Sequence, residues 1–406
     1  MHNLGEVKDE MQKIQESYSY VPNKSKPQVV CVNDIWAYVL FQGSGVMKSA
    51  VRELREEFME FLSSQGFEVS IGFDTPLGRT RLGKRLKNYL FRDAIYLTSE
   101  SGGWQSAEDF AKFQKNLNKK IDLCCGSDLN RPKTITVDEF LRKPFQGSFV
   151  FKDESANRGE GKLLIETPQQ FEIFKKFHSD FIKKDPHFFD TIVFQQFIET
   201  PTDNFTSLRV VMSSSGDVMV ANLKHSGGTT KKAKPEGRFG RFLCDPESEY
   251  FLNCRSIISN PMPGGRGECE IIFGKNQYRS EERKMLKAHG FDPKNPKLPD
   301  SLVRVAAAIA KNCNRELGVT CGIDFILNTN DSKWYFLEAN SNPDVKDYAE
   351  TKGITNPSAL DTFKLDIASK YEALVMYMIE RTKQRENLNQ NAPHKEVAKK
   401  SAQPFK

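Results

Sequence analysis

Long hydrophobic runs are missing from this sequence. No run approaches the roughly 18 apolar residues that a membrane-spanning helix needs, so we expect no membrane partner. The first residues, MHNLGEVKDEMQKIQ, are polar and include acids, and they lack the pattern of a secretory signal. Charged residues make up 28% and hydrophobic residues 38% of the 406 residues. This balance and this length predict a soluble globular protein with two or three domains.

Paired cysteines are missing as well. The eight cysteines are scattered, no two are spaced as CxxC, and none of the six histidines flanks them as zinc ligands would. The pattern therefore favours reduced thiols and a cytoplasmic location. Cys124 and Cys125, on an expected helix, are interpreted as core residues rather than as a redox pair. No histidine has a serine, cysteine or metal-binding partner at a motif spacing, so we assign none a catalytic role.

A strong excess of one charge is also missing. Lys and Arg number 59 against 53 Asp and Glu, which gives a net charge of +6. This mild excess allows an anionic substrate but does not require a nucleic acid, and we expect none as a partner. The aromatic segment FHSDFIKKDPHFFD, residues 177–190, is interpreted as packing rather than as a nucleic-acid platform. The sequence also shows no internal repeat.

What is present is a succession of strand and helix patterns. In residues 1–106, strand-like segments such as PQVVCVN and FEVSIGF alternate with helical ones such as SAVRELREEFMEFLSSQG. This alternation predicts a small α/β domain with a parallel sheet. Residues 107–200 and 201–385 mix strands and helices without that rhythm, so we expect an α+β fold with a small and a large lobe. A final helix over residues 359–385 precedes a polar, basic tail, residues 386–406, which we expect to be disordered.

Two neighbouring strands carry acids between apolar residues. The stretch GIDFILNTNDSKWYFLEANSNPD reads as a hairpin, with Asp324 on its first strand and Glu338 and Asn340 on its second. Glu338 and Asn340 are two residues apart, so both side chains point to one face. An acid inside an apolar strand is costly unless something pairs it. Three converging oxygen donors suit Mg²⁺, so we interpret them as a metal site rather than as solvated strand ends.

This hairpin resembles the metal hairpin of ATP-grasp ligases. VFQQFIE resembles the strand that enters the family's adenine hinge, FVFKDES resembles the strand of its phosphate-binding lysine, and SANRGEG resembles its mobile glycine-rich lid. The resemblance implies ATP and Mg²⁺ as cofactors, with two metal ions and with Mn²⁺ as an alternative. The cofactor-binding residues that it implies are Lys119, Lys152, Ser155, Gly159, Gly161, Gln195, Gln196, Phe197 and Ile198.

In the adenine hinge, the side chains of Gln195 and Gln196 would lie beside the base, and backbone groups of Phe197 and Ile198 would bind it. For the family's first nucleotide lysine, Lys119 fits best, and Lys115 and Lys120 are alternatives.

Later segments resemble the RimK-like and glutathione-synthetase-like branch of the family. LRVVMSSSGDVMVANLK implies Arg209 near the reacting carboxylate and the γ-phosphate, and Lys224 as a second cation. SNPMPGG resembles the SN-x-x-x-GG segment of this branch and implies Asn260 at the phosphate or substrate site. These three residues form the candidate catalytic set.

The chain also departs from the branch pattern. Ile258 stands where the branch has an arginine before Ser-Asn, and Arg241, Arg255 or Arg266 is a possible replacement. Ser207 stands where the family has an aspartate. The asparagine of the metal hairpin is followed by Pro-Asp rather than Pro-Gly. The basic insertion over residues 224–241 reads equally well as a solvated loop and as a clamp for an anionic substrate.

The resemblance implies an ADP-forming ligase that joins a carboxylate to an amine through an acyl phosphate. Three alternatives stay open: a kinase on the same fold, a protein-modifying ligase similar to the tubulin-tyrosine-ligase-like enzymes, and a binding module without catalysis. The intact metal trio counts against the last. The substrates would be a small-molecule or peptide carboxylate and an amine, and the mild positive charge of the chain allows them to be anionic. Their identity and the oligomeric state do not follow from the motifs.

Overall fold

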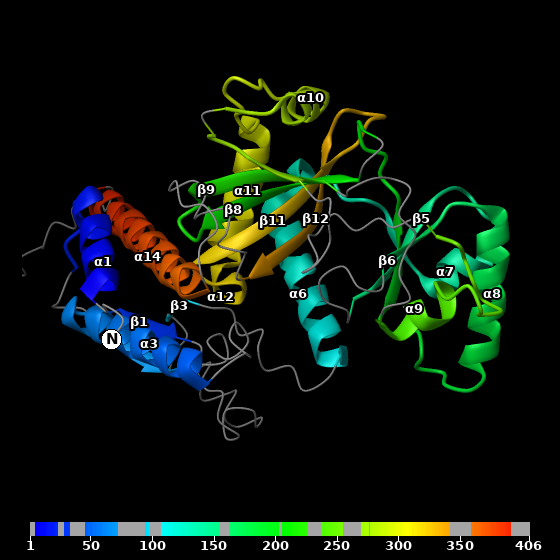
Figure 1. Ribbon diagram of the computed structural model, residues 1–406, viewed down its shortest axis with the longest axis horizontal. Coiled ribbons are helices and arrows are strands. Elements are labelled where there is room, and N and C mark those ends of the chain that lie inside the picture. Colours follow the sequence, from blue (N-terminus) through cyan, green and yellow to red (C-terminus); the bar gives the residue numbers. More distant parts are fainter. Residues whose placement is uncertain are drawn as a thin grey trace, which may run out of the picture.

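The structure, a computed structural model, describes residues 5–22, 28–32, 45–71, 94–97, 107–154, 162–202, 205–225, 237–254, 269–275, 277–341 and 359–390. These residues form three sheets, each with its own helices (Figure 1). One sheet is parallel and two are antiparallel, which confirms the expected α+β class with a small parallel sheet.

The amino-terminal unit is built on the parallel sheet. Strand β1 (Val29–Val32) lies between β2 (Glu68–Ile71) and β3 (Ile95–Tyr96), and helices α1 (Gly5–Ser17) and α3 (Gly45–Ser64) pack beside them. Along α3, apolar residues recur at helical spacing, so one face of the helix enters the core. The buried residues of that face are Leu54, Phe58, Phe61 and Leu62.

The long carboxy-terminal helix α14 (Ala359–Gln390) belongs to the same core. It lies beside α1 (Figure 1), and its Tyr371 and Leu374 are fully buried among the residues of α1 and α3. The sequence grouped these residues with the large lobe and ended the helix at residue 385, whereas the helix continues to Gln390.

The small unit is a four-stranded antiparallel sheet in the order β4-β7-β5-β6. Its strands are β4 (Thr134–Thr136), β5 (Phe149–Asp153), β6 (Lys162–Ile165) and β7 (Ile192–Gln196). Helices α7 (Val137–Arg142) and α8 (Pro168–Ile182) begin at threonine capping boxes, in which the threonine hydroxyl accepts a hydrogen bond from the backbone three residues later.

Phenylalanine fills the core of this small unit. Phe151, Phe174, Phe177 and Phe194 are fully buried and meet one another mostly edge to face. The segment at residues 177–190 contributes Phe177 and Phe189 to this core, which confirms its interpretation as packing.

Helix α9 (Gly237–Leu243), which begins within the carboxyl end of the basic insertion, packs into this core. Its buried Phe239 lies 5.1 Å from Phe151 between ring centres, so the carboxyl end of the insertion is packed against the small unit. Residues 226–236 of the insertion lie outside the described residues.

The large unit is a five-stranded antiparallel sheet in the order β10-β9-β8-β11-β12. Its strands are β8 (Thr206–Ser213), β9 (Val218–His225), β10 (Cys269–Ile272), β11 (Thr320–Leu327) and β12 (Trp334–Ser341). Its helices are α6 (Ala107–Cys125), α10 (Ser280–Ala288), α11 (Asp300–Asn312) and α12 (Asn314–Leu317).

One face of the large sheet is apolar and lies against α6 and α11. Leu208 and Val210 of β8 and Ile323 of β11 are fully buried there with Ile121 of α6. The sequence had grouped α6 with the small lobe. Because side chains alternate along a strand, the residues between these apolar ones point to the opposite face.

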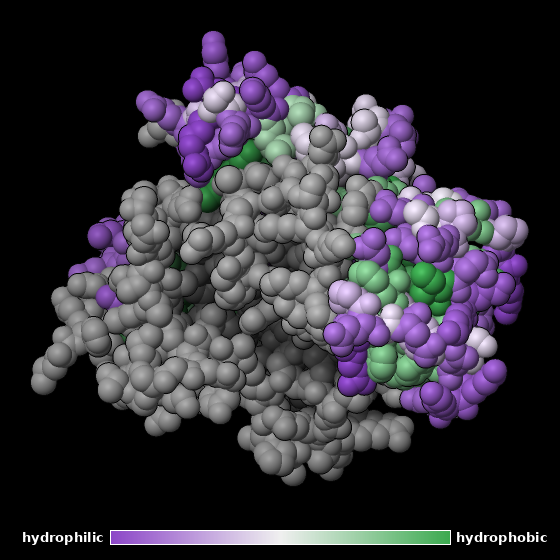
Figure 2. Space-filling model, turned by 45° about the vertical axis from the view of Figure 1, so that its right-hand side comes forward, coloured by the Kyte–Doolittle hydropathy of each residue, from purple (hydrophilic) through white to green (hydrophobic). Residues whose placement is uncertain are grey.

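On the face that Figure 2 shows, the described surface over α10 and over the small unit is largely hydrophilic, with hydrophobic patches among the hydrophilic residues. Within the described residues, no helix is both long and apolar enough to cross a bilayer.

Candidate functional site

One row of residues crosses four strands of the large sheet. In register, Asn222 of β9 lies opposite Arg209 of β8, Arg209 opposite Asp324 of β11, and Asp324 opposite Glu338 of β12. Asn340 follows two residues later on β12 and shares this face. The row lies on the side of the sheet away from the apolar core, so the predicted metal trio and the predicted catalytic arginine come together on one face.

Arg209 and Asp324 form a two-pronged ion pair. The Nε and Nη2 atoms of Arg209 donate to Oδ1 and Oδ2 of Asp324 at 2.7 and 2.6 Å. Only 12% of the Arg209 side chain and 7% of the Asp324 side chain are exposed. A planar fork matched to a carboxylate makes short, charge-assisted hydrogen bonds that a lysine cannot reproduce.

Asn340 connects the two carboxylates. Its Nδ2 donates to Oδ2 of Asp324 at 3.2 Å and to Oε1 of Glu338 at 3.3 Å. A rotation of this amide would present its oxygen to the same point instead. The three side chains therefore offer a compact set of oxygen donors, which is the chemistry that Mg²⁺ prefers. Two carboxylates and an amide fit a magnesium site, although the described parts of the chain hold no cluster of three or more His, Cys, Asp or Glu that could bind a metal.

Two lysines of the small sheet face Glu338. The Nζ atoms of Lys152 on β5 and Lys162 on β6 lie 3.8 and 3.6 Å from Oε2 of Glu338. Register places these lysines directly opposite each other across the β5-β6 pair. The two ion pairs join the small sheet to the large one, so the junction of the units holds acids from one side and cations from the other.

Charge and burial at this junction shift the pKa values of Glu338 and Lys152. The charge of Lys162 first, then that of Lys152 and Arg209 and the hydrogen bond from Asn340, hold the pKa of Glu338 well below its ordinary value despite burial. Burial lowers the pKa of Lys152, and the Glu338 carboxylate opposes that change. Glu338 is therefore an anion that its surroundings stabilise strongly.

Lys162 was not among the residues predicted from the sequence. No motif marks it, because it follows the lid-like segment at the start of a short apolar strand. The pairing of the two strands could have indicated it, because Lys162 lies opposite Lys152 when β5 and β6 form a hairpin.

The structure places Lys224 on the same face as the row. It lies on β9, opposite Ser207 of β8 and Glu270 of β10, and only 3% of it is exposed. Ser207 stands where the family that the motifs resemble has an aspartate. Asn260, and with it Ser155, Gly159 and Gly161 of the lid-like segment, lie outside the described residues.

The predicted adenine hinge lies at the end of β7. The Phe197 N–H already donates to the Ser148 carbonyl at 3.0 Å, and the Phe197 ring packs against Phe205. The Ile198 side chain is buried, whereas Gln196 is exposed. Adenine binding at this hinge would therefore use the Phe197 carbonyl and the Ile198 backbone, because the Phe197 N–H is already engaged.

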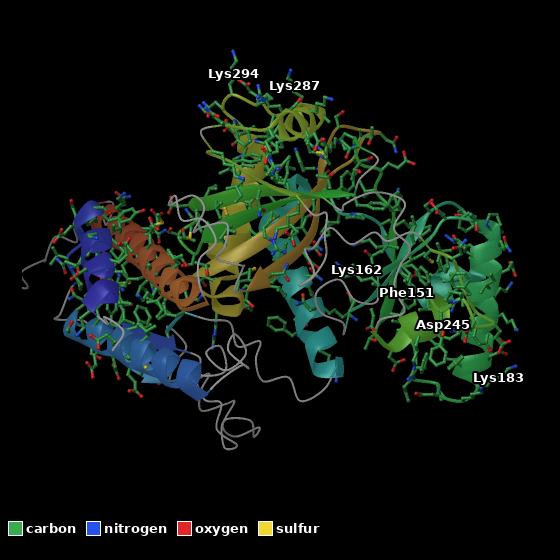
Figure 3. All side chains as sticks on the ribbon, viewed as in Figure 1. Phe151, Lys162, Lys183, Asp245, Lys287 and Lys294 are labelled. Atoms are coloured by element: carbon green, nitrogen blue, oxygen red, sulfur yellow. The ribbon has the colours of Figure 1, made fainter. Side chains whose placement is uncertain are left out.

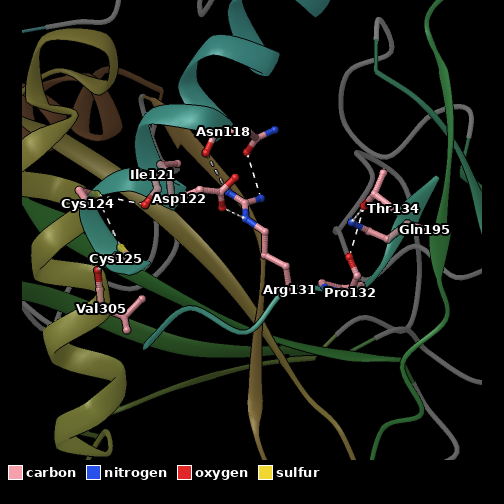
Figure 4. Close-up of polar contacts among 10 residues, drawn as sticks. All are labelled: Asn118, Ile121, Asp122, Cys124, Cys125, Arg131, Pro132, Thr134, Gln195 and Val305. Atoms are coloured by element: carbon pink, nitrogen blue, oxygen red, sulfur yellow. Dashed lines mark hydrogen bonds and ion pairs between the residues drawn. The ribbon is translucent and has the colours of Figure 1, made fainter. Parts of the chain in front are cut away.

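The hinge strand is braced from the α6 side (Figure 4). Arg131, in the link between α6 and β4, donates to Asp122 at 2.5 Å and to Asn118 at 3.2 Å, and Gln195 donates to Thr134 of β4 at 3.4 Å. These contacts fix the approach of the chain from the large sheet to the small one.

The three candidate nucleotide lysines on α6 have different surroundings. Lys120 forms an ion pair with Glu316 at 2.8 Å, and Lys119 is exposed. Lys115 is also exposed, but its charge acts on Glu154 at the end of β5 and opposes the rise in the pKa of Glu154 that burial causes.

Arg241, one possible replacement for the arginine that Ile258 displaces, stacks over the ring of Phe242 at 4.7 Å on the small unit. The other two, Arg255 and Arg266, lie outside the described residues, as does Ile258.

No protein-family model matches the sequence, and a comparison with curated proteins finds no match. Among solved structures, the chain is similar to D-alanine–D-alanine ligase from Bacillus anthracis in complex with ATP, at 12% identity over 88% of this chain and 99% of that one, with a TM-score of 0.39.

The chain is also similar to the ATP-grasp ligase PsnB complexed with its minimal precursor, at 12% identity over 81% of this chain and 96% of that one, with a TM-score of 0.36. A third similar structure is L-amino acid ligase from Bacillus licheniformis, at 12% identity over 85% and 74% of the two chains, with a TM-score of 0.37.

Proposed function

We propose that this protein is an ATP-grasp ligase that joins a carboxylate to an amine and releases ADP and phosphate. The observation that carries the proposal is the facing arrangement at the junction of the two units. Asp324, Glu338 and Asn340 lie on one face of the large sheet, and Lys152 of the small sheet points its ammonium group at them. Phosphates bound at this junction would contact the metal held by the acids on one side and the lysine on the other.

The proposed reaction has two steps. An oxygen of the substrate carboxylate attacks the γ-phosphorus of ATP, the bond to the β-phosphate oxygen breaks, and ADP leaves. An amine then attacks the carbonyl carbon of the acyl phosphate, phosphate leaves with the bonding electrons, and the amine loses a proton. No side chain acts as nucleophile, so the protein contributes positioning and charge stabilisation.

The residues divide this work. Asp324, Glu338 and Asn340 would hold Mg²⁺, which offsets the charge of the triphosphate. Lys152 adds a second positive charge from the small sheet. The guanidinium of Arg209 would stabilise the charge that moves onto the transferred phosphoryl group. Its position depends on Asp324, a proposed metal ligand, because the two side chains share two hydrogen bonds. Lys224 on the same face is proposed as a further cation near the substrate.

For the first nucleotide lysine we propose Lys119, with Lys115 and Lys120 as alternatives. The substrates are proposed to be small molecules or peptides, and a cytoplasmic location fits the scattered, reduced cysteines.

The test is a screen for ADP release with amino acids, peptides and acidic proteins as acid and amine, followed by mass analysis of the products. We expect ADP to form with a suitable pair, together with a product that has lost one water in total. A product that gains a phosphoryl group and no amide would identify the kinase alternative instead. An amide on an acidic protein would select the protein-modifying alternative. Wild-type protein that binds no ATP in the presence of Mg²⁺ would contradict the proposal altogether.

A further inference from the structure

Lys152 and Lys162 share a single carboxylate at the junction of the units. They lie directly opposite each other on β5 and β6, and both Nζ atoms are within 4 Å of the same oxygen of Glu338, at 3.8 and 3.6 Å. Like charges on directly opposed strand residues repel each other. The anion between them offsets this repulsion, so the pair is stable in this arrangement because Glu338 is present.

The same carboxylate is a candidate metal ligand. If Glu338 turns to a metal ion, its negative charge is shared with that ion, so Lys162 loses its ion-pair partner and Lys152 keeps only the weaker influence of Glu154. Both lysine side chains are mostly enclosed, with 20% exposed for Lys152 and 26% for Lys162, so water replaces the carboxylate only in part. A replacement anion is then required, and the triphosphate is the one that arrives with the metal.

We propose that Lys162 is a second phosphate-binding lysine and that Glu338 occupies the place of the phosphates when no nucleotide is bound. This inference rests on the proposed function, because it concerns the same nucleotide site. It goes beyond the motifs, which mark Lys152 and leave Lys162 unassigned. Figure 3 shows Lys162 on the side of the small unit that faces the large one, with Lys183 at the opposite end.

An exchange of partners follows from this arrangement. Without nucleotide, the two lysine–Glu338 ion pairs hold the small sheet to the large one. With nucleotide and metal, the lysines turn to phosphate oxygens and Glu338 turns to the metal. Glu338 therefore competes with ATP whenever metal is absent and assists ATP when metal is present.

The experiment measures ATP affinity by calorimetric titration with Mg²⁺ and, separately, with EDTA. Three variants are compared with wild type: Lys162→Met, Glu338→Gln and the matched control Lys183→Met, which removes an exposed lysine of the same unit. We expect Lys162→Met to weaken ATP binding roughly tenfold to a hundredfold in both conditions, the scale of one charge-assisted hydrogen bond. Lys183→Met should bind as wild type does.

The Glu338→Gln variant gives the sharper readout. In EDTA it should bind ATP several-fold more tightly than wild type, because the competing carboxylate is gone, whereas with Mg²⁺ it should bind more weakly. Lys162→Arg, which keeps the charge, should retain most of the ATP affinity in EDTA. This result would attribute the loss of affinity in Lys162→Met to the loss of charge. Circular dichroism of each variant checks that the fold is kept.

The outcomes separate the two proposals. Wild type that binds ATP while Lys162→Met binds it equally well would overturn the role of Lys162 and leave the ligase proposal standing. Glu338→Gln that binds ATP in EDTA no better than wild type would overturn the exchange of partners. Wild type that binds no ATP in either condition would overturn the ligase proposal and this inference with it.

Discussion

Arg209 and Asp324 lie opposite each other on neighbouring antiparallel strands and share two hydrogen bonds of 2.7 and 2.6 Å. The arginine proposed to act on the substrate is thus held by an acid proposed to bind the metal. A change at either residue is therefore expected to affect both metal binding and the contact with the substrate.

Replacement of Arg209 by lysine should separate binding from catalysis. Lysine keeps the charge next to Asp324 but cannot form both hydrogen bonds of the fork. We expect ATP affinity to stay within roughly tenfold of wild type and the rate of ADP release to fall on the order of a hundredfold or more, the scale for one preorganised charge-stabilising contact. ATP titration and ADP release with the active substrate pair measure the two quantities.

Two other results would change the role of Arg209. Equal losses in affinity and rate would make it a nucleotide-binding residue. No loss in either would remove it from the site.

Glu338→Gln should abolish turnover and leave the fold intact. The change keeps the size of the side chain and removes the charge that a metal needs. Glu316→Gln is a matched control, because Glu316 is also ion-paired to a lysine and its side chain is equally exposed, at 27%. ADP release at saturating Mg²⁺ is the measurement, and wild-type turnover by Glu338→Gln would exclude the metal trio.

Phe174→Ala should destabilise the small unit. Phe174 is fully buried, and its ring meets those of Phe151 and Phe194. Its removal leaves a cavity, which costs about 3–5 kcal/mol for an aromatic residue. Urea unfolding measures the loss, with Leu123→Ala as control because Leu123 is 79% exposed and its replacement should change stability by less than about 0.5 kcal/mol. A loss at Phe174 no larger than the control's would contradict the packing.

Alkylation of Cys125 should depend on pH differently in the native and unfolded chain. Burial, and next the neighbouring Cys124 thiol, raise the pKa of Cys125 well above its ordinary value. Only the thiolate reacts, so in the unfolded chain the rate should level off above pH ~8.5, the ordinary thiol pKa. In the native protein the rate should keep rising about tenfold per pH unit beyond that point.

The raised pKa of Cys125 also makes its contribution to the stability of the folded protein depend on pH. A raised pKa means that the folded state holds its proton longer, so the contribution of Cys125 to stability is complete below the ordinary pKa and declines as pH rises towards the raised one. Mass spectrometry after labelling with iodoacetamide from pH 7 to pH 10 measures the rate. A plateau near pH 8.5 in the native protein would contradict the shift.

Part of the site could be predicted from the sequence because it depends on local geometry. Side chains alternate along a strand, so the two-residue spacing of Glu338 and Asn340 placed both on one face. A short hairpin returns the chain past its own first strand, which brought Asp324 opposite Glu338. The same alternation placed Arg209 on the face opposite Leu208 and Val210. The parallel amino-terminal sheet followed from the succession of strand and helix patterns.

The sequence by itself therefore determined which residues share a face, since strand and helix periods are properties of a few consecutive residues. Tertiary structure alone decided which faces meet. The ion pair of Arg209 with Asp324 spans 115 positions, and Lys162 reaches Glu338 from another sheet. Ile121 and Tyr371 likewise lie in cores to which the sequence did not assign their helices. An apolar or charged face shows that a partner is needed but not which one, because that choice depends on how distant elements pack together.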